Sequence, residues 1–279
     1  MHLGGAVNIL ITVNSFASLT GSELYCYELA REYRKRGHSV TVAAGLVGGI
    51  VAEKARGLGV RVVGLESVPD DAYDVLHVNQ HQAGARAAAL FKRLPVVNTI
   101  HSEHPALEKF ERPLSPRRVA RYIAIRPSIA DALVRRFRIP AGKIEVVCNP
   151  IDFSRFNREG TSDNGRPLFA GPDDFLRRGV IERWQGKADF IGRGFATPPV
   201  WNIEDRVKRC AFTLGISLGR TTIEGWACVK KGFIYEVDER GNILSEREEP
   251  PPEDISRFDS SRVAESLIEI YQSVYYFAR

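Results

Sequence analysis

An apolar run at residues 211–217 predicts a strand, and residues suited to a phosphate site follow it. The turn after this run and the first residues of the predicted helix are Gly219, Arg220, Thr221 and Thr222. The amides at a helix start, together with hydroxyl groups and a guanidinium, can hold a diphosphate. Glu224 lies one turn further on, where its two oxygens can accept hydrogen bonds from two ribose hydroxyls. The structural alternative is that Thr221 caps the helix and Glu224 favours its dipole.

A second candidate anion site follows the first apolar run of the chain. Asn14 ends this run, and Thr20, Gly21 and Ser22 precede a segment with helical periodicity. Amides at the start of a helix receive anions, and a glycine lets the backbone approach a ligand closely. Ser22 is equally explained as an ordinary N-cap of the helix. Both interpretations stay open for Gly21 and Ser22.

Histidines supply the candidates for catalysis. His101 ends a predicted strand at residues 95–101, and Glu103 and His104 follow it. Because ligands bind at the carboxyl ends of parallel strands, His101 is the candidate catalytic histidine, and Gly21 and Glu224 complete the catalytic candidates. His77 lies inside an apolar run and is expected in the core, whereas His81 in the following loop could line the same edge.

The remaining patterns predict neither a metal site nor a cofactor site. No set of His, Asp and Glu residues has metal-ligand spacing, and no Walker loop occurs. The four cysteines, Cys26, Cys148, Cys210 and Cys228, are scattered and suggest buried thiols. We therefore expect no bound metal and no cofactor.

The elements that must position these residues alternate between strands and helices. In the first half, apolar strands are predicted at 8–15, 39–45, 60–65, 73–80, 95–101, 121–127 and 143–150. Helical segments separate most of them, which predicts a parallel, doubly wound sheet. A shorter series follows, with strands at 167–171, 188–192, 211–217 and 232–238.

The composition divides the chain into domains. The polar, Gly-rich segment 153–167 predicts an interdomain linker, and the acidic, Pro-rich segment 245–261 predicts a surface excursion. We expect a first domain at residues 1–155, a short second domain at 156–262, and a terminal helix at 263–279 that packs back on the first domain. At 279 residues, two domains are the natural expectation.

Bulk composition is that of a soluble globular protein, with 44% hydrophobic and 26% charged residues. No apolar run reaches the roughly 20 residues that cross a bilayer, and the first residues show no basic leader. These features predict a cytoplasmic protein. The net charge is +5, and arginines concentrate at residues 117–138. That stretch is either a solvated helix face or a peripheral contact with an acceptor or the inner membrane face.

A family resemblance rests on the order of several segments. The chain carries NILITVNSFASLTGSELYCYELAREYRKRGHSVTVAA, YDVLHVNQHQ, PVVNTIHSEHP, YIAIRPSIADAL, KIEVVCNPIDFSRF and GRTTIEGWACVKKGFIYEVD. In this order they resemble glycosyltransferase family 4. The last segment is similar to the donor-site motif of that family, usually Gly-Arg-Thr-x-Leu-Glu-Ala-Met-Ala-Cys-Gly followed by a strand. The resemblance covers most of residues 8–156 and about 210–240.

The resemblance implies the α/β GT-B fold, in which two Rossmann-like domains face each other across a cleft, here with a reduced second domain. Gly21, followed by Ser22, matches the loop that touches the donor phosphate and the reacting sugar. His101 matches the active-site histidine beside the sugar. Glu224 matches the carboxylate that binds the ribose, and the residues from Gly219 to Thr222 match the diphosphate-binding turn.

Other positions depart from the family pattern. Arg177 and Arg178 are loose counterparts of the basic residues at the start of the second domain, because the usual Lys-Gly pair is absent. Ile216 stands where a further Glu is common. Val229 and Lys231 replace a usual glycine and proline, and the second half is shorter than in the family.

The resemblance thus implies a retaining, metal-independent glycosyltransferase that uses a nucleoside diphosphate sugar as donor. We expect a saccharide, a lipid-linked molecule or a protein as acceptor, and no specific nucleic acid. Ile216 and the short second domain also fit a non-catalytic nucleotide-sugar-binding or partner subunit. A nucleic-acid-binding protein fits the charge, but the basic stretch is poor in aromatic residues. An epimerase or dehydrogenase should show a Gly-x-Gly-x-x-Gly turn after the first strand, and 14–21 lacks it.

Overall fold

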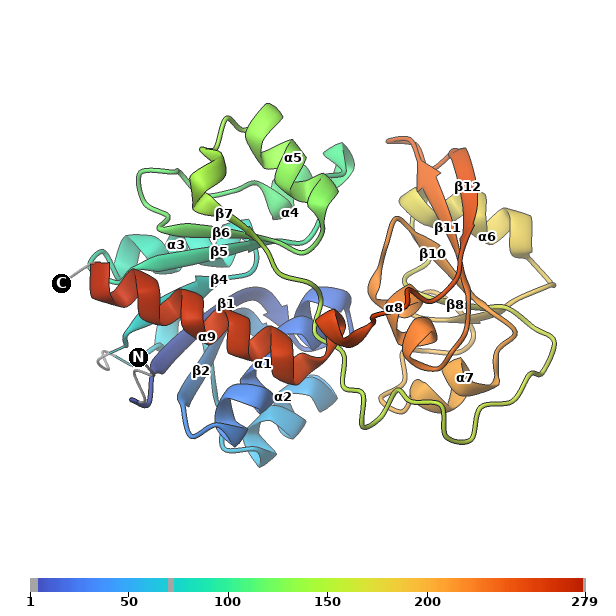
Figure 1. The fold of residues 1–279 in the computed structure, drawn as a ribbon, viewed down its shortest axis with the longest axis horizontal. Coiled ribbons are helices and arrows are strands. Elements are labelled where there is room, and N and C mark those ends of the chain that lie inside the picture. The colour runs from blue at the N-terminus through green and yellow to red at the C-terminus, as the bar shows by residue number, and fades with distance from the viewer. Residues whose placement is uncertain (1–4, 70–72, 278–279) are drawn as a thin grey trace. The chain divides into compact units, whose positions relative to one another are not determined.

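The computed structural model describes residues 5–69 and 73–277, which form two compact units (Figure 1). The first unit comprises Met1–Pro150 and Ser260–Arg279, and the second comprises Ile151–Asp259. The expected boundaries at residues 155 and 262 differ from these divisions. Within the second unit, the N–H of Ile151 donates to the carbonyl of Phe258 at 2.8 Å, so the two segments that leave this unit lie side by side.

The first unit is built on a parallel sheet of seven strands in the order β3-β2-β1-β4-β5-β6-β7. The strands are β1 (Asn8–Phe16), β2 (Ser39–Val47), β3 (Arg61–Gly64), β4 (Val75–Val78), β5 (Val96–Ile100), β6 (Arg121–Ala124) and β7 (Ile144–Val146). Most of their residues are apolar and buried, as expected for a sheet covered on both faces. The strand order reverses between β1 and β4, which is where such sheets bind ligands.

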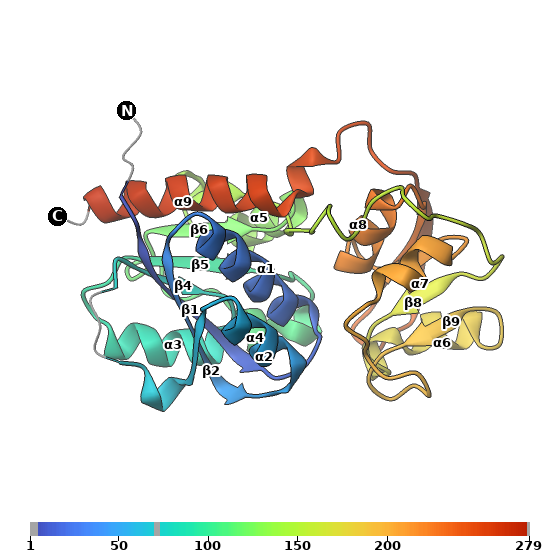
Figure 2. The same cartoon turned by 90° about the horizontal axis from the view of Figure 1, so that it is seen from below.

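Helices cover both faces of this sheet (Figures 1 and 2). They are α1 (Gly21–Lys35), α2 (Gly49–Gly57), α3 (His81–Leu90), α4 (Glu108–Glu111), α5 (Pro127–Arg135) and α9 (Ser260–Phe277). Neighbouring residues of β4 show the two faces. His77 contacts Tyr271 of α9, whereas Val78 packs so closely on α3 that a Cβ at Gly84 would lie 2.0 Å from its side chain.

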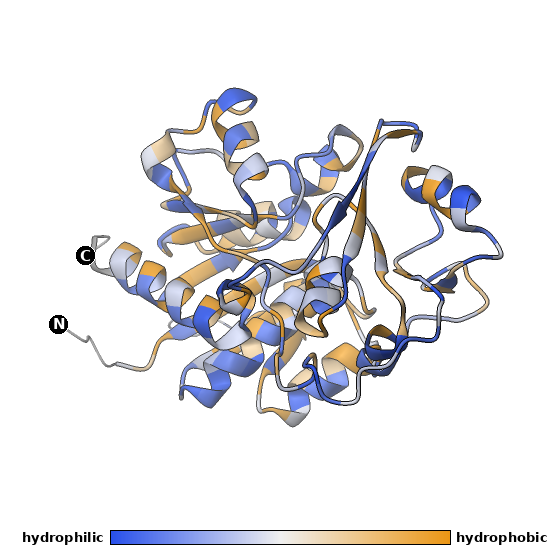
Figure 3. Ribbon diagram, turned by 45° about the vertical axis from the view of Figure 1, so that its right-hand side comes forward, coloured by the Kyte–Doolittle hydropathy of each residue, from blue (hydrophilic) through white to orange (hydrophobic). Residues whose placement is uncertain are grey.

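The terminal helix α9 belongs to the first unit and packs beside α1 (Figure 2). Arg31 of α1 donates to the Ser260 hydroxyl at 3.0 Å, and the Tyr33 and Tyr271 hydroxyls lie 2.9 Å apart. The Tyr271 hydroxyl is also 2.5 Å from His77 Nδ1, and His77 Nε2 is 2.7 Å from the Thr99 hydroxyl. His77 is therefore a hydrogen-bonded core residue. Helix α9 completes the core of the first unit, whose strands are coloured mainly as hydrophobic in Figure 3.

The second unit contains a sheet of five strands in the order β12-β11-β10-β8-β9. The strands are β8 (Leu168–Ala170), β9 (Asp189–Ile191), β10 (Thr213–Ile216), β11 (Gly232–Val237) and β12 (Ile243–Glu249). The first four are parallel, and β12 pairs antiparallel with β11. The helices of this unit are α6 (Arg178–Trp184), α7 (Glu204–Arg209) and α8 (Arg220–Ala227).

Two segments of the second unit differ from the sequence predictions. The predicted linker 153–167 lies inside this unit, because Phe156 is buried and Arg155 binds Glu204 and the carbonyl of Trp201. The predicted surface excursion at 245–261 begins as the edge strand β12. Its charged side chains form ion pairs with β11 and α6, for example Arg247 with Glu236 and Glu246 with Arg183.

Within the described residues, no helix combines the length and the apolar composition needed to cross a membrane.

Candidate functional site

Glu23 organises the loop that carries Gly21 at the carboxyl end of β1. Its carboxylate is 1% exposed and accepts hydrogen bonds from the backbone N–H groups of Ala17, Ser18 and Thr20 at 3.1 Å each. The hydroxyls of Ser15, Ser18 and Thr20 also donate to it, at 2.7–2.9 Å. One buried carboxylate thus holds residues 15–20 in a single conformation.

The structure places Gly21 and Ser22 in the first turn of α1, beside this loop. Gly21 is exposed and Ser22 is half-buried, and a Cβ at Gly21 would meet no atom within 4 Å. The N-cap residue is Thr20 and not Ser22, and Glu23 binds the Thr20 N–H as in a capping box. Glu23 was missed as a functional residue, although Thr20-x-x-Glu23 is the sequence signature of that box.

His101 follows β5 and lies against α1. Its ring meets the ring of Tyr25 edge-on at 4.8 Å between centroids. Burial, and then the positive charge of Arg126, lower the pKa of His101 to about 3, so the imidazole is neutral at physiological pH. Its Nε2 atom is buried and has no hydrogen-bond partner among the described residues. The unpaired nitrogen of a neutral imidazole can form a hydrogen bond with a ligand hydroxyl, as donor or as acceptor according to its tautomer.

Glu111 of α4 holds the backbone next to His101. The N–H of His101 donates to Glu111 Oε2 at 2.8 Å, and the N–H of Ser102 and the side chain of Gln80 also donate to this carboxylate. Burial raises the pKa of Glu111 to about 7, against the opposing effect of these donors. The sequence offered no signal for Glu111, because the fold alone brings it to the end of β5.

The other residues of this loop have structural partners. Glu103 is bound by Arg126 and by the Ser128 hydroxyl, and these charges and hydrogen bonds lower its pKa despite burial. His104 Nδ1 accepts a hydrogen bond from the N–H of Ala106 at 3.2 Å. His81 begins α3, and its Nδ1 lies 2.9 Å from the carbonyl oxygen of Arg112. Of the three histidines near this edge, His101 is the one with an unpaired buried nitrogen.

In the second unit, the candidate diphosphate residues gather at the carboxyl end of β8. The strand order reverses between β8 and β10, so this end is the switch point of the sheet. The Thr221 hydroxyl donates to the carbonyl of Ala170, the last residue of β8, at 3.2 Å. The Arg177 guanidinium lies over the next residue, because a Cβ at Gly171 would be 3.3 Å from Arg177 Nε. The start of α8 and Arg177 therefore share this switch point.

Arg220 and Glu224 form an ion pair along one turn of α8. Arg220 Nε lies 2.6 Å from Glu224 Oε1, and the two side chains are 10% and 5% exposed. The pair explains how the helix buries a glutamate near its start, because an arginine one turn earlier compensates its charge. The residues assigned to the diphosphate and to the ribose are thus in direct contact.

Other assigned residues are oriented differently from the prediction. Thr222 is fully buried, and its hydroxyl packs where a Cβ at Gly215 would be 2.9 Å away, so it cannot face an anion. Only the backbone amides of Thr221 and Thr222 remain candidates. Gly219 is the N-cap of α8 with an extended backbone. Arg178 is exposed, and Arg177 binds Asp174 at 2.6 Å.

The two positions with unusual residues have distinct structures. Ile216, where the family resemblance leads one to expect a Glu, is half-buried at the end of β10. Val229 follows α8 with φ of 60°, a left-handed conformation that favours glycine. The residue that replaces the usual glycine therefore keeps the glycine-type backbone.

Part of the basic stretch 117–138 is used inside the first unit. Arg118 donates to the carbonyls of Phe91 and Leu94, and Arg126 binds Glu103. Arg136 binds Glu108 and the carbonyl of Glu103. These contacts give three of the arginines a structural role, so the stretch is less free for a partner than its sequence indicates.

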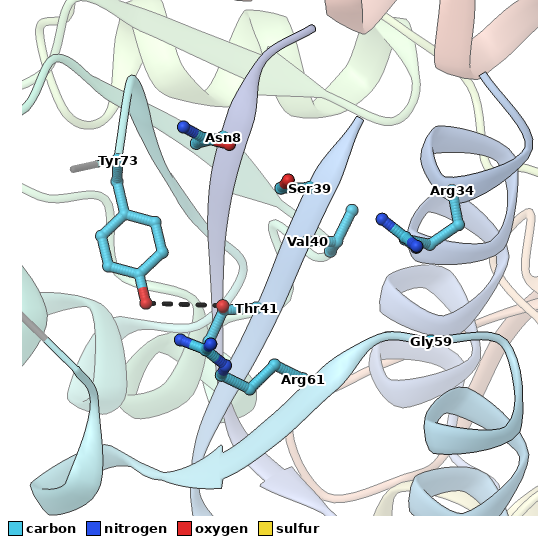
Figure 4. Close-up of a pocket in the computed structure, with 8 residues that line it drawn as sticks. All are labelled: Asn8, Arg34, Ser39, Val40, Thr41, Gly59, Arg61 and Tyr73. Carbon is cyan, nitrogen blue, oxygen red and sulfur yellow. Dashed lines mark hydrogen bonds between the residues drawn. The ribbon is translucent and has the colours of Figure 1, made fainter. Parts of the chain in front are cut away.

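A polar cavity of about 440 Å³ lies at the opposite edge of the first sheet (Figure 4). It is lined by Asn8, Arg34, Ser39, Val40, Thr41, Gly59, Arg61 and Tyr73. Asn8, Ser39 and Arg61 begin β1, β2 and β3, so the cavity is at the amino ends of these strands. It is therefore separate from Gly21 and His101. Among the described residues, no group of three or more His, Cys, Asp and Glu side chains is placed to hold a metal ion.

Several solved structures have the same fold as this chain. A glycosyltransferase from Rickettsia africae ESF-5 has a TM-score of 0.65 at 11% identity, over 97% of this chain and 99% of that chain. Alr3699/HepE of Anabaena, solved with UDP and glucose, has a TM-score of 0.62 at 14% identity, over 98% and 92%. A UDP-N-acetylglucosamine 2-epimerase has a TM-score of 0.52 at 10% identity, over 98% and 91%.

A family model matches the sequence of the first half of the chain. No curated protein sequence matches this chain. The family model described as Glycosyltransferase Family 4 matches residues 19–155, which include Gly21, His101 and Glu111. The chain has the GT-B type of architecture over nearly its whole length. The resemblance of residues 19–155 to glycosyltransferase family 4, which the sequence predicted, is therefore confirmed.

Proposed function

We propose that this chain transfers a sugar from a nucleoside diphosphate sugar to an acceptor hydroxyl, with retention at the anomeric carbon and without a metal ion. The observation that carries the proposal is the buried Arg220–Glu224 pair at the switch point of the second sheet. Two comparisons support it, namely the family 4 match over residues 19–155 and the likeness to HepE, which was solved in complex with UDP and glucose.

In this proposal the second unit binds the nucleotide. Glu224 accepts the ribose hydroxyls, a task that suits a carboxylate held rigidly in a buried helix turn. Arg220, the amides of Thr221 and Thr222, and Arg177 neutralise the diphosphate. The negative charge on the diphosphate grows as its bond to the sugar breaks, so these groups lower the barrier by electrostatic stabilisation. Arg177 is favoured over the exposed Arg178, because Arg177 lies over the end of β8.

The first unit supplies the residues that act on the sugar. His101 is neutral and offers its unpaired Nε2 to a sugar hydroxyl, which orients the transferring group. Gly21 and Ser22 present the first amides of α1, in a loop held by Glu23, to the donor. The acceptor oxygen bonds to the anomeric carbon, its proton leaves, and the nucleoside diphosphate is released.

The experiment is incubation with a panel of nucleoside diphosphate sugars, with and without a chelator, and measurement of the released nucleoside diphosphate. We expect release from one donor in the presence of the chelator. We also expect at least a tenfold slower release in His101→Ala, since a lost sugar contact in the transition state costs about that much or more. His81→Ala, a change of the same type at a half-buried histidine whose Nδ1 atom already contacts the carbonyl of Arg112, should release it at the wild-type rate.

A second candidate is a non-catalytic nucleotide-sugar-binding subunit. The apolar Ile216 at the end of β10 favours it, because a carboxylate is absent from that position. This candidate predicts that a nucleoside diphosphate binds but that no donor in the panel is consumed. A changed configuration at the sugar C2 would instead indicate the chemistry named for the epimerase neighbour.

A further inference from the structure

Glu111 is a buried carboxyl group to which the proposed function assigns no role. It lies in the short helix α4 and is 8% exposed. Its carboxylate accepts hydrogen bonds from the backbone N–H groups of two consecutive residues, His101 and Ser102. Two adjacent amides directed at one carboxylate fix the path of the backbone, and hence the direction in which the His101 side chain leaves it.

A second set of contacts joins Glu111 to the switch point of the first sheet. The Gln80 side chain donates to Glu111, and its Oε1 accepts the N–H of Asn14 at 3.0 Å. Asn14 Oδ1 accepts the N–H of Ala83 in α3 at 2.9 Å. Hydrogen bonds therefore connect the carboxyl ends of β1, β4 and β5 through Glu111.

We propose that Glu111 is a positioning residue, whose ionised carboxylate holds the His101–Ser102 backbone and thereby orients the His101 imidazole toward the sugar. This inference rests on the proposed function, because the reaction step assigned to His101 comes from there. Glu111 acts through His101 and not on the substrate.

The number of acceptor sites on the carboxyl group explains why its ionisation matters. An ionised carboxylate offers two accepting oxygens to its three donors, the N–H groups of His101 and Ser102 and the Gln80 amide. A protonated carboxyl group has lost its negative charge and carries a hydrogen on one oxygen, so it accepts the hydrogen bonds of these three groups more weakly. Because burial raises the pKa of Glu111 to about 7, the carboxyl group changes between its ionised and protonated forms near neutral pH.

Neither His101 nor Glu103 titrates in place of Glu111 near neutral pH. His101 stays neutral, because burial holds its pKa at about 3. Glu103 stays ionised, because Arg126 and Ser128 keep its pKa below the ordinary value. On its own helix, Glu108 is paired with Arg136, and the Lys109 ammonium lies over the ring of Phe110 at 4.8 Å. His81 and His104 are the remaining imidazoles facing this loop.

The first measurement needs no variant of Glu111 and no substrate. Backbone amide chemical shifts of His101 and Ser102 are followed by NMR from about pH 5.5 to about pH 8.5. We expect the two amides to shift together with one midpoint near that of Glu111, and the midpoint to persist in the double variant H81Q/H104Q. Amide shifts that stay flat over this range, or a transition that disappears in the double variant, would overturn the proposal.

The second measurement compares Glu111→Gln with Glu108→Gln, which makes the same change on the exposed part of the same helix. In Glu111→Gln the coupled amide transition should vanish, and kcat for donor turnover should fall by roughly tenfold to a hundredfold. In wild type, kcat should decline below neutral pH as Glu111 becomes protonated, and this decline should be absent in Glu111→Gln. KM for the donor should change by less than about twofold, because the nucleotide site lies in the second unit. Glu108→Gln should retain the wild-type profile.

The results separate this inference from the proposed function. If the two amides titrate together and this transition is lost in Glu111→Gln, the role of Glu111 in holding His101 is supported. If the same protein consumes no donor, sugar transfer is refuted. Donor turnover in Glu111→Gln with the kcat and pH profile of Glu108→Gln refutes the inference and leaves sugar transfer in place. If Glu111→Gln does not fold, the wild-type titration decides alone.

Discussion

Arg220 Nε lies 2.6 Å from Glu224 Oε1, one turn further along α8, and the two side chains are 10% and 5% exposed. A buried ion pair contributes little net stability, because desolvation offsets its attraction, but loss of one partner leaves an uncompensated charge. The pair holds a carboxylate and a guanidinium at the carboxyl end of β8, where a nucleotide would need both.

Glu23→Ala should lower the free energy of unfolding by about 2–4 kcal/mol, because the N–H groups of Ala17, Ser18 and Thr20 lose their acceptor. Chemical denaturation measures this change. Ser22→Ala, at a half-buried neighbour that makes none of these contacts with Glu23, should shift stability by less than about 0.5 kcal/mol. Equal effects of the two substitutions would mean that Glu23 does not organise the loop.

Tyr271→Phe should destabilise the protein by about 1–3 kcal/mol, because His77 Nδ1 and the Tyr33 hydroxyl both lose a buried partner. Tyr73→Phe is the control, because its hydroxyl makes a weaker contact with Thr41 at 3.4 Å. Thermal unfolding of the two variants gives the comparison. A Tyr271→Phe protein as stable as the control would show that α9 is not held by this chain of hydrogen bonds.

Val229→Gly should raise the free energy of unfolding by about 0.5–1 kcal/mol, because a β-branched residue is strained at φ of 60°. The same substitution at Val134, inside α5, should lower it by about 0.3–0.5 kcal/mol, since glycine is less favourable than valine in a helix. Denaturant midpoints of the two variants should therefore move in opposite directions. A loss of stability in both would contradict the left-handed conformation at Val229.

The stability of the protein should depend on pH through Glu111. Its folded-state pKa, about 7, is above the ordinary value of about 4.3, so folding favours the protonated form. Its contribution is fully present below the ordinary pKa and is lost as the pH rises through about 7, a change of roughly 3–4 kcal/mol. Denaturation curves from about pH 5 to about pH 8 should show this decline in wild type and not in Glu111→Gln. An identical decline in the variant would assign it to another group.

Periodicity predicted most of the fold, because buried parallel strands and amphipathic helices have strong sequence signals. The donor-site segment formed the expected strand, turn and helix, and His77 is in the core. β12 was not predicted, because its charged residues are stabilised by pairing with β11 and not by burial. Edge strands of this kind lack the apolar signal of central ones.

The candidate sites were predictable only where the contacts are local. Thr20 and Glu23 are three residues apart, so their capping box could have been recognised. The burial of the Thr222 hydroxyl depends on Gly215 and Gly232 of the neighbouring strands, which sequence periodicity does not reveal. Glu111 reaches the end of β5 through the path of the 101–108 segment, and its partner Gln80 is the N-cap residue of α3, far away in the sequence.

The proposed donor site is tested most directly by calorimetric titration of nucleoside diphosphates into wild type, Glu224→Gln and Glu182→Gln. Glu182 is an exposed residue of α6, so its substitution controls for loss of charge in the same unit. We expect one nucleoside diphosphate to bind wild type and Glu182→Gln equally, and Glu224→Gln at least about tenfold more weakly, a loss of about 1.4 kcal/mol. Equal affinity in all three proteins, or no binding of any nucleoside diphosphate to wild type, would contradict the account.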